Sequence, residues 1–199
     1  SYYESALDWA KLILRGFSPV SGVGKHDAPS LLFPMEAVFE AYVAKHLTKQ
    51  LHANFDLKTQ ATSQYLVEHE GQQWFRLKPD LLVKQNQTTR LVLDTKWKLL
   101  DAAKKSGREK YQLSQADFYQ LYAYGQHYLD GTGDVVLIYP KTDAFTKPLS
   151  VFDFPQALGM RLWVLPFCLD DRQLLWPADS DFSRFFCSGA VETAQEHVA

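Results

Sequence analysis

Two apolar, β-prone segments joined by a short polar link place the strongest constraint on how this chain can fold. The segments are residues 76–83 and 90–96, and the link at residues 85–89 has the composition of a turn. They predict a hairpin. Each segment also carries an aspartate, Asp80 or Asp94, among its apolar residues. Because charged side chains are rarely buried without a reason, the hairpin predicts a functional site as well as a core.

The acidic residues and a nearby lysine predict a metal site on this hairpin. Side chains alternate along a strand, so Asp94 and Lys96 share one face, while Thr95 points away and leaves its backbone carbonyl free at the strand edge. Asp80 is expected to meet them across the ladder. Mg²⁺ prefers such oxygen ligands and takes water and phosphate in its remaining positions, so we predict Asp80, Asp94 and Thr95 as ligands. Lys96 would position the attacking water or stabilise negative charge on a phosphate. The alternative is a surface ion pair beside a strand entrance.

Basic residues follow the second strand and predict contacts with a phosphate backbone. They are opposed only by Asp101 and Glu109, in a chain whose net charge is −2. The alternative is a solvated loop with Ser106 and Gly107 at its tip. The predicted DNA-binding residues are Lys98, Lys104, Lys105, Arg108 and Lys110.

Two helices are expected to flank the strands. One begins at Pro34 and carries apolar residues at helical spacing as far as Leu51. On it, Glu40 either faces the metal site or is a solvent-facing acid, Glu36 is interpreted as solvent-facing, and His46 is interpreted as a packing residue. The second helix, capped by Ser114 and Asp117, runs towards Gly131.

Several of these segments together resemble the PD-(D/E)xK nuclease superfamily. They are Pro79-Asp80, residues 93–98 (Leu-Asp-Thr-Lys-Trp-Lys) and residues 120–124 (Gln-Leu-Tyr-Ala-Tyr). Together with Phe33-Pro34-Met35 and Phe39-Glu40, the phrase around Asp94 is more narrowly similar to the McrC-like nuclease subunits of McrBC modification-dependent restriction systems. The resemblance implies that Glu40 completes the metal site. It also matches Gln120 and Tyr124, one turn apart, to a Gln-x-x-x-Tyr element that assists the site in RecB-like nucleases; the alternative is that these two residues are core.

The resemblance covers about residues 31–186 and implies a restriction-endonuclease-like α/β fold. Its expected core has the order αβββαβ, a mixed sheet flanked by helices. Residues 1–30 would be a leading helix and loop, residues 31–190 the nuclease domain and residues 191–199 a tail. The expected chain is the C-terminal catalytic part of such a protein, without the N-terminal part that engages the motor.

The function implied by the resemblance is Mg²⁺-dependent cleavage of double-stranded DNA at methylated cytosine. It depends on GTP hydrolysis by the AAA+ partner McrB and on two nuclease domains pairing on DNA. GTP would be bound by the partner, because the segment around residues 22–26 (Gly-Val-Gly-Lys-His) does not match a P-loop. Pro19 occupies the position of the first P-loop glycine, and His26 occupies the Ser/Thr position. The alternatives are a non-catalytic nuclease-like scaffold and a RecB-like exonuclease.

Composition places this chain among cytoplasmic, single-domain proteins. With 199 residues, 46% of them hydrophobic, it can bury one substantial core. Cys168 and Cys187 have neither zinc-ligand spacing nor a disulfide framework, and a reducing bacterial cytoplasm fits. No apolar segment approaches the roughly 18 residues of a membrane span, so no membrane association is expected.

Overall fold

The computed structural model describes residues 34–157 and 159–191. The helix expected within residues 5–15 and the loop after it lie outside these described residues, as do tail residues 192–199. Among the described helices, none is long and apolar enough to span a bilayer.

A mixed, seven-stranded sheet forms the centre of the described part of the chain. The order along the sheet is β1-β4-β5-β6-β8-β7, with β9 also pairing with β8. The β4–β5 pair is antiparallel, whereas β5, β6 and β8 run parallel to one another. The strands are β1 (Asp56–Thr59), β4 (Leu81–Gln85), β5 (Thr88–Thr95), β6 (Gly133–Pro140), β7 (Phe152–Asp153), β8 (Met160–Cys168) and β9 (Gln173–Leu174).

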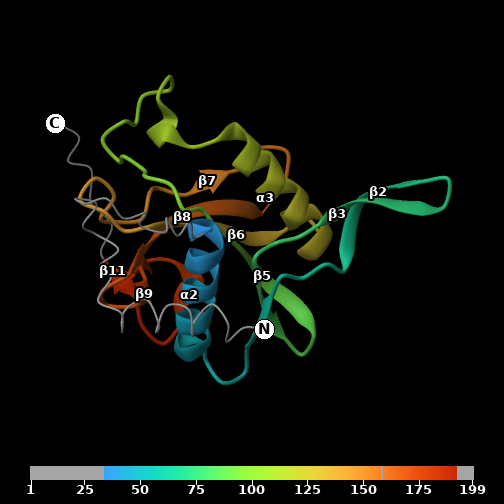
Figure 1. The fold of residues 1–199 in the computed structure, drawn as a ribbon, viewed down its shortest axis with the longest axis horizontal. Helices are drawn as coiled ribbons and strands as arrows, with labels where there is room; N and C mark the ends of the chain where they lie inside the picture. Colours follow the sequence, from blue (N-terminus) through green and yellow to red (C-terminus); the bar gives the residue numbers. More distant parts are fainter. Residues whose placement is uncertain (1–33, 158, 192–199) are drawn as a thin grey trace, which may run out of the picture. The chain divides into compact units, whose positions relative to one another are not determined.

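The helices cover opposite faces of this sheet (Figure 1). Helix α2 (Met35–Gln50) buries Phe39, Val43 and Leu47 against odd-numbered residues of β4 and β5. Helix α3 (Gln115–Tyr128) buries Leu121 and Tyr124 against even-numbered residues of the same strands. This arrangement confirms a mixed α/β domain, and it orients Asp94 and Lys96 of the β5 end towards α3.

The β4–β5 hairpin is present, but the first strand is shorter than the sequence predicts. Residues 76–83 do not form one strand: β3 (Gln72–Leu77) ends before Pro79, and β4 starts at Leu81. Proline cannot donate a backbone hydrogen bond to a strand ladder, which explains the break. Asp80 therefore lies in the connection just before β4 and not within a strand.

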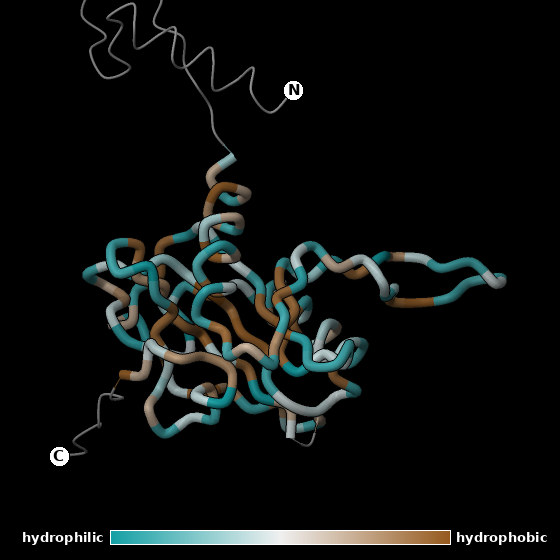
Figure 2. The backbone as a smooth tube through the Cα atoms, turned by 90° about the horizontal axis from the view of Figure 1, so that it is seen from below, coloured by the Kyte–Doolittle hydropathy of each residue, from teal (hydrophilic) through white to brown (hydrophobic). Residues whose placement is uncertain are grey.

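The antiparallel run β1-β4-β5 contains an additional two-stranded ribbon, inserted between β1 and β4. Strand β2 (Gln64–His69) pairs only with β3, as a separate two-stranded ribbon, and β1 pairs directly with β4. Figures 1 and 2 show this ribbon projecting from the main sheet, with hydrophobic residues running into it. The β2–β3 ribbon is thus inserted between two neighbouring strands of the sheet.

The elements expected after the hairpin are present. Helix α3 and strand β6 follow the hairpin in the expected αβββαβ order, and β6 is parallel to β5. A 3₁₀ turn lies at Asp181–Arg184. Val191, predicted to belong to the tail, instead pairs with Pro177 through β11 (Ala190–Val191) and β10 (Trp176–Pro177). Ser114 stands at the start of α3, although its side chain makes no capping hydrogen bond.

Candidate functional site

Asp94 and Lys96 form a tight ion pair at the carboxyl end of β5. Lys96 Nζ lies 2.5 Å from Asp94 Oδ2, and Asp94 is 2% exposed. Burial, followed by the charge of Asp80, raises the pKa of Asp94 to about 7, although Lys96 opposes this shift. Burial lowers the pKa of Lys96, but Asp94 and other carboxylates outweigh that effect, so its net pKa is raised. The lysine therefore stays cationic, while the carboxyl group titrates near neutrality.

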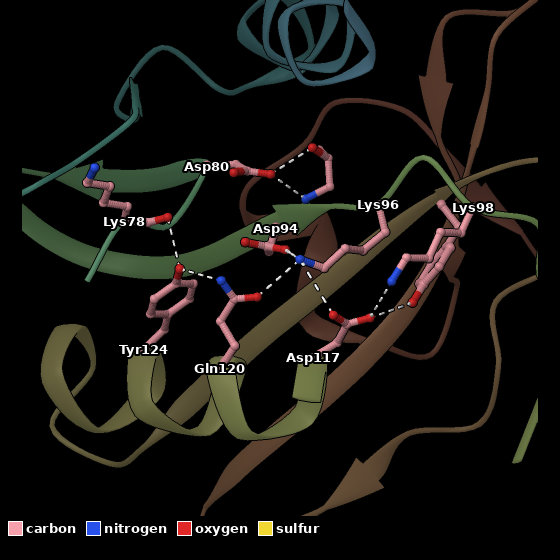
Figure 3. A network of polar contacts seen from close by, with 10 residues as sticks. Lys78, Asp80, Asp94, Lys96, Lys98, Asp117, Gln120 and Tyr124 are labelled. Carbon is pink, nitrogen blue, oxygen red and sulfur yellow. Dashed lines mark hydrogen bonds and ion pairs between the residues drawn. The ribbon is translucent and has the colours of Figure 1, made fainter. Parts of the chain in front are cut away.

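Asp80 is held beside this pair by Thr95. Its Oδ2 accepts hydrogen bonds from both the backbone N–H and the hydroxyl of Thr95, each at 2.7 Å. The Thr95 side chain lies on the opposite face from Asp94, as predicted, but it reaches Asp80 at the end of the strand. Figure 3 shows Asp80 just before β4 and Asp94 on the neighbouring strand β5, with Asp94 nearer to α3.

Gln120 and Tyr124 extend the site onto α3. A series of hydrogen bonds runs from Lys96 through these two residues to the connection between β3 and β4. Lys96 Nζ donates to Gln120 Oε1 at 3.1 Å, and Gln120 Nε2 donates to the Tyr124 hydroxyl at 2.8 Å. That hydroxyl donates to the Lys78 carbonyl at 2.9 Å (Figure 3). Burial, followed by the charge of Asp94, raises the pKa of Tyr124 to about 12, so it remains a neutral donor. The two residues are therefore more than core packing.

Asp117 is a site residue that the sequence analysis did not identify, because it was interpreted only as part of the helix cap. It is 7% exposed, and its carboxylate lies 3.7 Å from Lys96 Nζ and 3.6 Å from Lys98 Nζ. Tyr139 also donates to it, at 3.5 Å. The signal in the sequence was its spacing, since Asp117 is one turn before Gln120 and two turns before Tyr124 on the same helical face.

Glu40 lies on the α2 side of the site. It is partly buried and accepts a hydrogen bond from Gln60 at 3.3 Å. Burial, followed by the charge of Asp80, raises the pKa of Glu40, so its carboxyl group is electrostatically coupled to that aspartate. Glu36, in contrast, is exposed, as expected, and His46 is buried with its ring 4.5 Å from Tyr42, which confirms a packing role.

The predicted basic contact residues divide into two groups. Lys98 pairs with Asp117, and Lys104 lies 3.9 Å from Asp101. Lys105, Arg108 and Lys110 are exposed on the loop between β5 and α3. The first group is thereby tied to the site and its adjoining loop.

The donor set at the end of β4 and β5 fits a hard divalent cation. It offers carboxylate oxygens from Asp80 and Asp94, and the buried Asp94 Oδ2 makes no hydrogen bond within the described residues apart from its ion-pair contact with Lys96. Within the same residues, no cage of three or more His, Cys, Asp or Glu side chains exists. Mg²⁺ does not need one, since it commonly binds one or two carboxylates and completes its shell with water and phosphate oxygens.

The fold and this cluster define a class: a mixed α/β domain with a carboxylate–lysine site at the ends of two central strands. The profile of the family described as "McrBC 5-methylcytosine restriction system component" matches residues 1–140. The chain belongs to this family. No curated protein matches it.

A solved structure has a similar fold. It is described as a refined half-complex from a tetradecameric assembly of Thermococcus gammatolerans McrB AAA+ hexamers with bound McrC. The matched chain is 21% identical, with a TM-score of 0.50, and the match covers 75% of the present chain. The present chain spans only 32% of that chain, and the likeness supports the fold alone.

Proposed function

We propose that this chain is the Mg²⁺-dependent DNA endonuclease subunit of a GTP-dependent, methylcytosine-directed restriction complex. The observation that carries the proposal is the convergence of Asp80, Asp94 and Lys96 at the ends of β4 and β5, in a member of the McrBC family. On this proposal the fold is the restriction-endonuclease-like αβββαβ core, with the β2–β3 ribbon inserted after its first strand.

Each residue has a role that follows from its position. Asp80 and Asp94 would hold Mg²⁺ together with the carbonyl of Thr95, and Glu40 would act from the α2 side. When bound, the ion would polarise the phosphate and acidify a water molecule. Lys96 would orient the attacking water and stabilise charge on the phosphate, since its ammonium group stays protonated beside the carboxylates. Gln120 would fix the lysine's position, with Tyr124 fixing Gln120 in turn.

The partners proposed for this chain follow from the family. We propose that an AAA+ GTPase of the McrB type binds GTP and supplies motor activity, and that McrB contacts a part of the protein outside this chain. Lys98, Lys104, Lys105, Arg108 and Lys110 would contact backbone phosphates of methylated duplex DNA. Because the described residues of each chain form one such site, cutting both strands would require two copies to pair on DNA.

Cleavage of a methylated circular plasmid by the reconstituted complex, with GTP and Mg²⁺, tests this proposal. We expect Asp80→Ala, Asp94→Asn and Lys96→Met each to reduce cleavage by about a hundredfold or more, since each removes a ligand or charge required in the transition state. Glu36→Gln, an exposed acid on α2, is the matched control and should cleave normally. Undiminished cleavage by Asp94→Asn would contradict the assignment.

A RecB-like exonuclease is the second candidate, favoured by the Gln120–Tyr124 hydrogen bond beside Lys96. The same plasmid separates the two activities, because a circle has no ends. Cleavage of linear DNA alone, without GTP, would identify the exonuclease. A scaffold would cut neither substrate and would still bind DNA or the partner.

A further inference from the structure

A pocket of about 520 Å³ lies between the β5–α3 loop, the start of α3 and β7. Helical spacing puts Gln115 and Phe118 on the flank of α3 opposite to Asp117 and Gln120, so this pocket is separate from the carboxylate site. Its volume falls in the range of small-molecule sites. The remaining lining residues used below are Lys105, Lys110, Tyr111 and Phe152.

The floor of the pocket is aromatic. Phe118 and Phe152 meet edge to face with ring centroids 5.3 Å apart, and Tyr111 meets Phe152 in the same way at 6.5 Å. All three side chains are only half-buried, so the pocket exposes ring surface. Such a surface suits a flat aromatic ligand, because every nucleobase has a π-face that stacks on aromatic side chains.

The wall of the pocket is a hydrogen-bonded loop in an unusual backbone conformation. Tyr111 N–H donates to the Lys104 carbonyl at 2.7 Å, and Lys110 N–H donates to the Ser106 carbonyl at 2.8 Å. Lys110, Tyr111 and Gln112 have φ angles of 49°, 55° and 65°, a left-handed turn without any glycine. Side chains disfavour this region, and conformations of this kind concentrate at ligand sites. The turn directs Tyr111 towards Phe152.

The charge at the rim favours an anion. Lys105 and Lys110 line the pocket, and Arg108 lies between them in the sequence. The nearby carboxylate of Glu109 is engaged by the Ser106 hydroxyl at 2.7 Å. A cationic rim above an aromatic floor is complementary to a base that carries a phosphate.

We propose that this pocket binds one unstacked nucleotide of the DNA substrate, with its base on Phe118 and Tyr111 and its phosphate beside Lys105 and Lys110. This inference rests on the proposed function for its choice of DNA as the ligand. Because the pocket lies on the other flank of α3 from Asp117 and Gln120, it would hold the strand outside the site of cleavage.

Calorimetric titration of the chain with thymidine 5′-monophosphate, in EDTA to prevent cleavage, tests the pocket. We expect binding that weakens about tenfold in Lys110→Glu and about tenfold in Phe118→Leu, which keeps apolar bulk but removes the ring. Thymidine and inorganic phosphate should each bind at least about tenfold more weakly than the nucleotide. A single-stranded tetranucleotide should compete with the nucleotide for the pocket.

The control is Arg90→Glu, which alters a residue that lines a different pocket and should leave nucleotide binding unchanged. Equal binding by inorganic phosphate would show that the site is only an anion patch and would overturn the proposal. Unchanged affinity in Lys110→Glu, which alters an exposed side chain, would overturn it as well. Asp94→Asn should retain nucleotide binding while losing cleavage. Loss of nucleotide binding and failure of the nuclease assignment are thus separate results.

Discussion

At the scale of single residues, the surroundings of Asp94 disfavour the ionised form of its carboxyl group. Burial and the neighbouring Asp80 favour its neutral form more strongly than Lys96 favours its charged form, which places its pKa at about 7. Without a cation, ionisation of this group therefore costs folding free energy at neutral pH. A divalent ion between the aspartates would remove that cost, which links metal binding to stability.

The stability of an Asp94→Asn variant checks this balance. The pKa of Asp94 in the folded protein, about 7, is above the ordinary value of 3.8. Its contribution to the free energy of unfolding is therefore fully present below about pH 4 and is lost as pH rises through 7. Asn stays neutral, so the variant should be more stable than the parent at pH 8 by ~2 kcal/mol, with the difference vanishing towards pH 4. Thermal unfolding from pH 4 to 8.5 in EDTA measures this difference.

The control for that series is Asp170→Asn, an exposed acid that should show no such trend. A variant less stable than the parent at pH 8 would mean that the ion pair with Lys96 outweighs burial. Added Mg²⁺ should stabilise the parent and not Asp94→Asn, because the variant lacks one of the two carboxylates.

The sequence predicted this site unevenly, for physical reasons. Strand alternation alone placed Asp94 and Lys96 together, because that spacing is local. The two hydrogen bonds from Thr95 to Asp80 were not predicted, because they depend on the interruption of the strand at Pro79. Asp117 was overlooked because an acid in the first turn of a helix is normally explained by the helix dipole.

At the scale of elements, the approach of α3 to the sheet positions Gln120 and Tyr124. Gly125 lies on the buried face of this helix, where a Cβ would be 2.2 Å from Met160 Sδ and 3.3 Å from Val135 Cγ1. The absence of a side chain thus lets the helix backbone pack close to β6 and β8. The distance from Gln120 to Lys96 depends on this close packing.

Gly125→Ala should therefore destabilise the protein although alanine is the better helix former. The propensity gain is about 1 kcal/mol, whereas forcing a methyl group into a packed contact costs about 1–3 kcal/mol. We expect a net loss of about 1 kcal/mol, seen as a lower denaturant midpoint, together with reduced cleavage. Gly107→Ala is the matched control, because nothing lies within 4 Å of its Cβ position. A midpoint equal to the parent's would show that Met160 yields freely.

The elements also differ in how well the sequence predicted them. Strand β5 and the two long helices were predicted because each has a strong local pattern, whereas β6 was expected from the order that the family resemblance implies. The β2–β3 ribbon was not separated from β4, because β-prone residues continue through both and only Pro79 marks the boundary. Which strand pairs with which is decided by contacts distant in the sequence, such as the pairing of Thr59 with Leu81.

At the scale of the whole molecule, the β2–β3 ribbon is separable from the sheet. Its strands pair only with each other, and the sheet continues from β1 to β4 without them. Four hydrophobic residues of the ribbon are exposed to solvent: the exposed fractions are 43% for Leu66, 43% for Val67, 45% for Trp74 and 68% for Phe75. It also holds Phe75 at a φ of 56°, which a side chain disfavours. The rest of the fold therefore gains little from its outer part.

Shortening the ribbon tests this independence. Residues 66–75 are replaced by Asn-Gly, which closes the cross-strand pair Tyr65 and Arg76 as a type I′ turn and retains the buried Leu77. We expect cooperative unfolding with a Tm within a few degrees of the parent, since no ladder of the main sheet is cut. A matched variant with Thr at all four apolar positions keeps the ribbon's length. Both variants should bind less of a hydrophobic dye, since they lose the same exposed apolar surface. Loss of cooperative unfolding in the shortened chain alone would show that the ribbon's backbone supports the sheet, because the threonine variant separates backbone from side-chain effects.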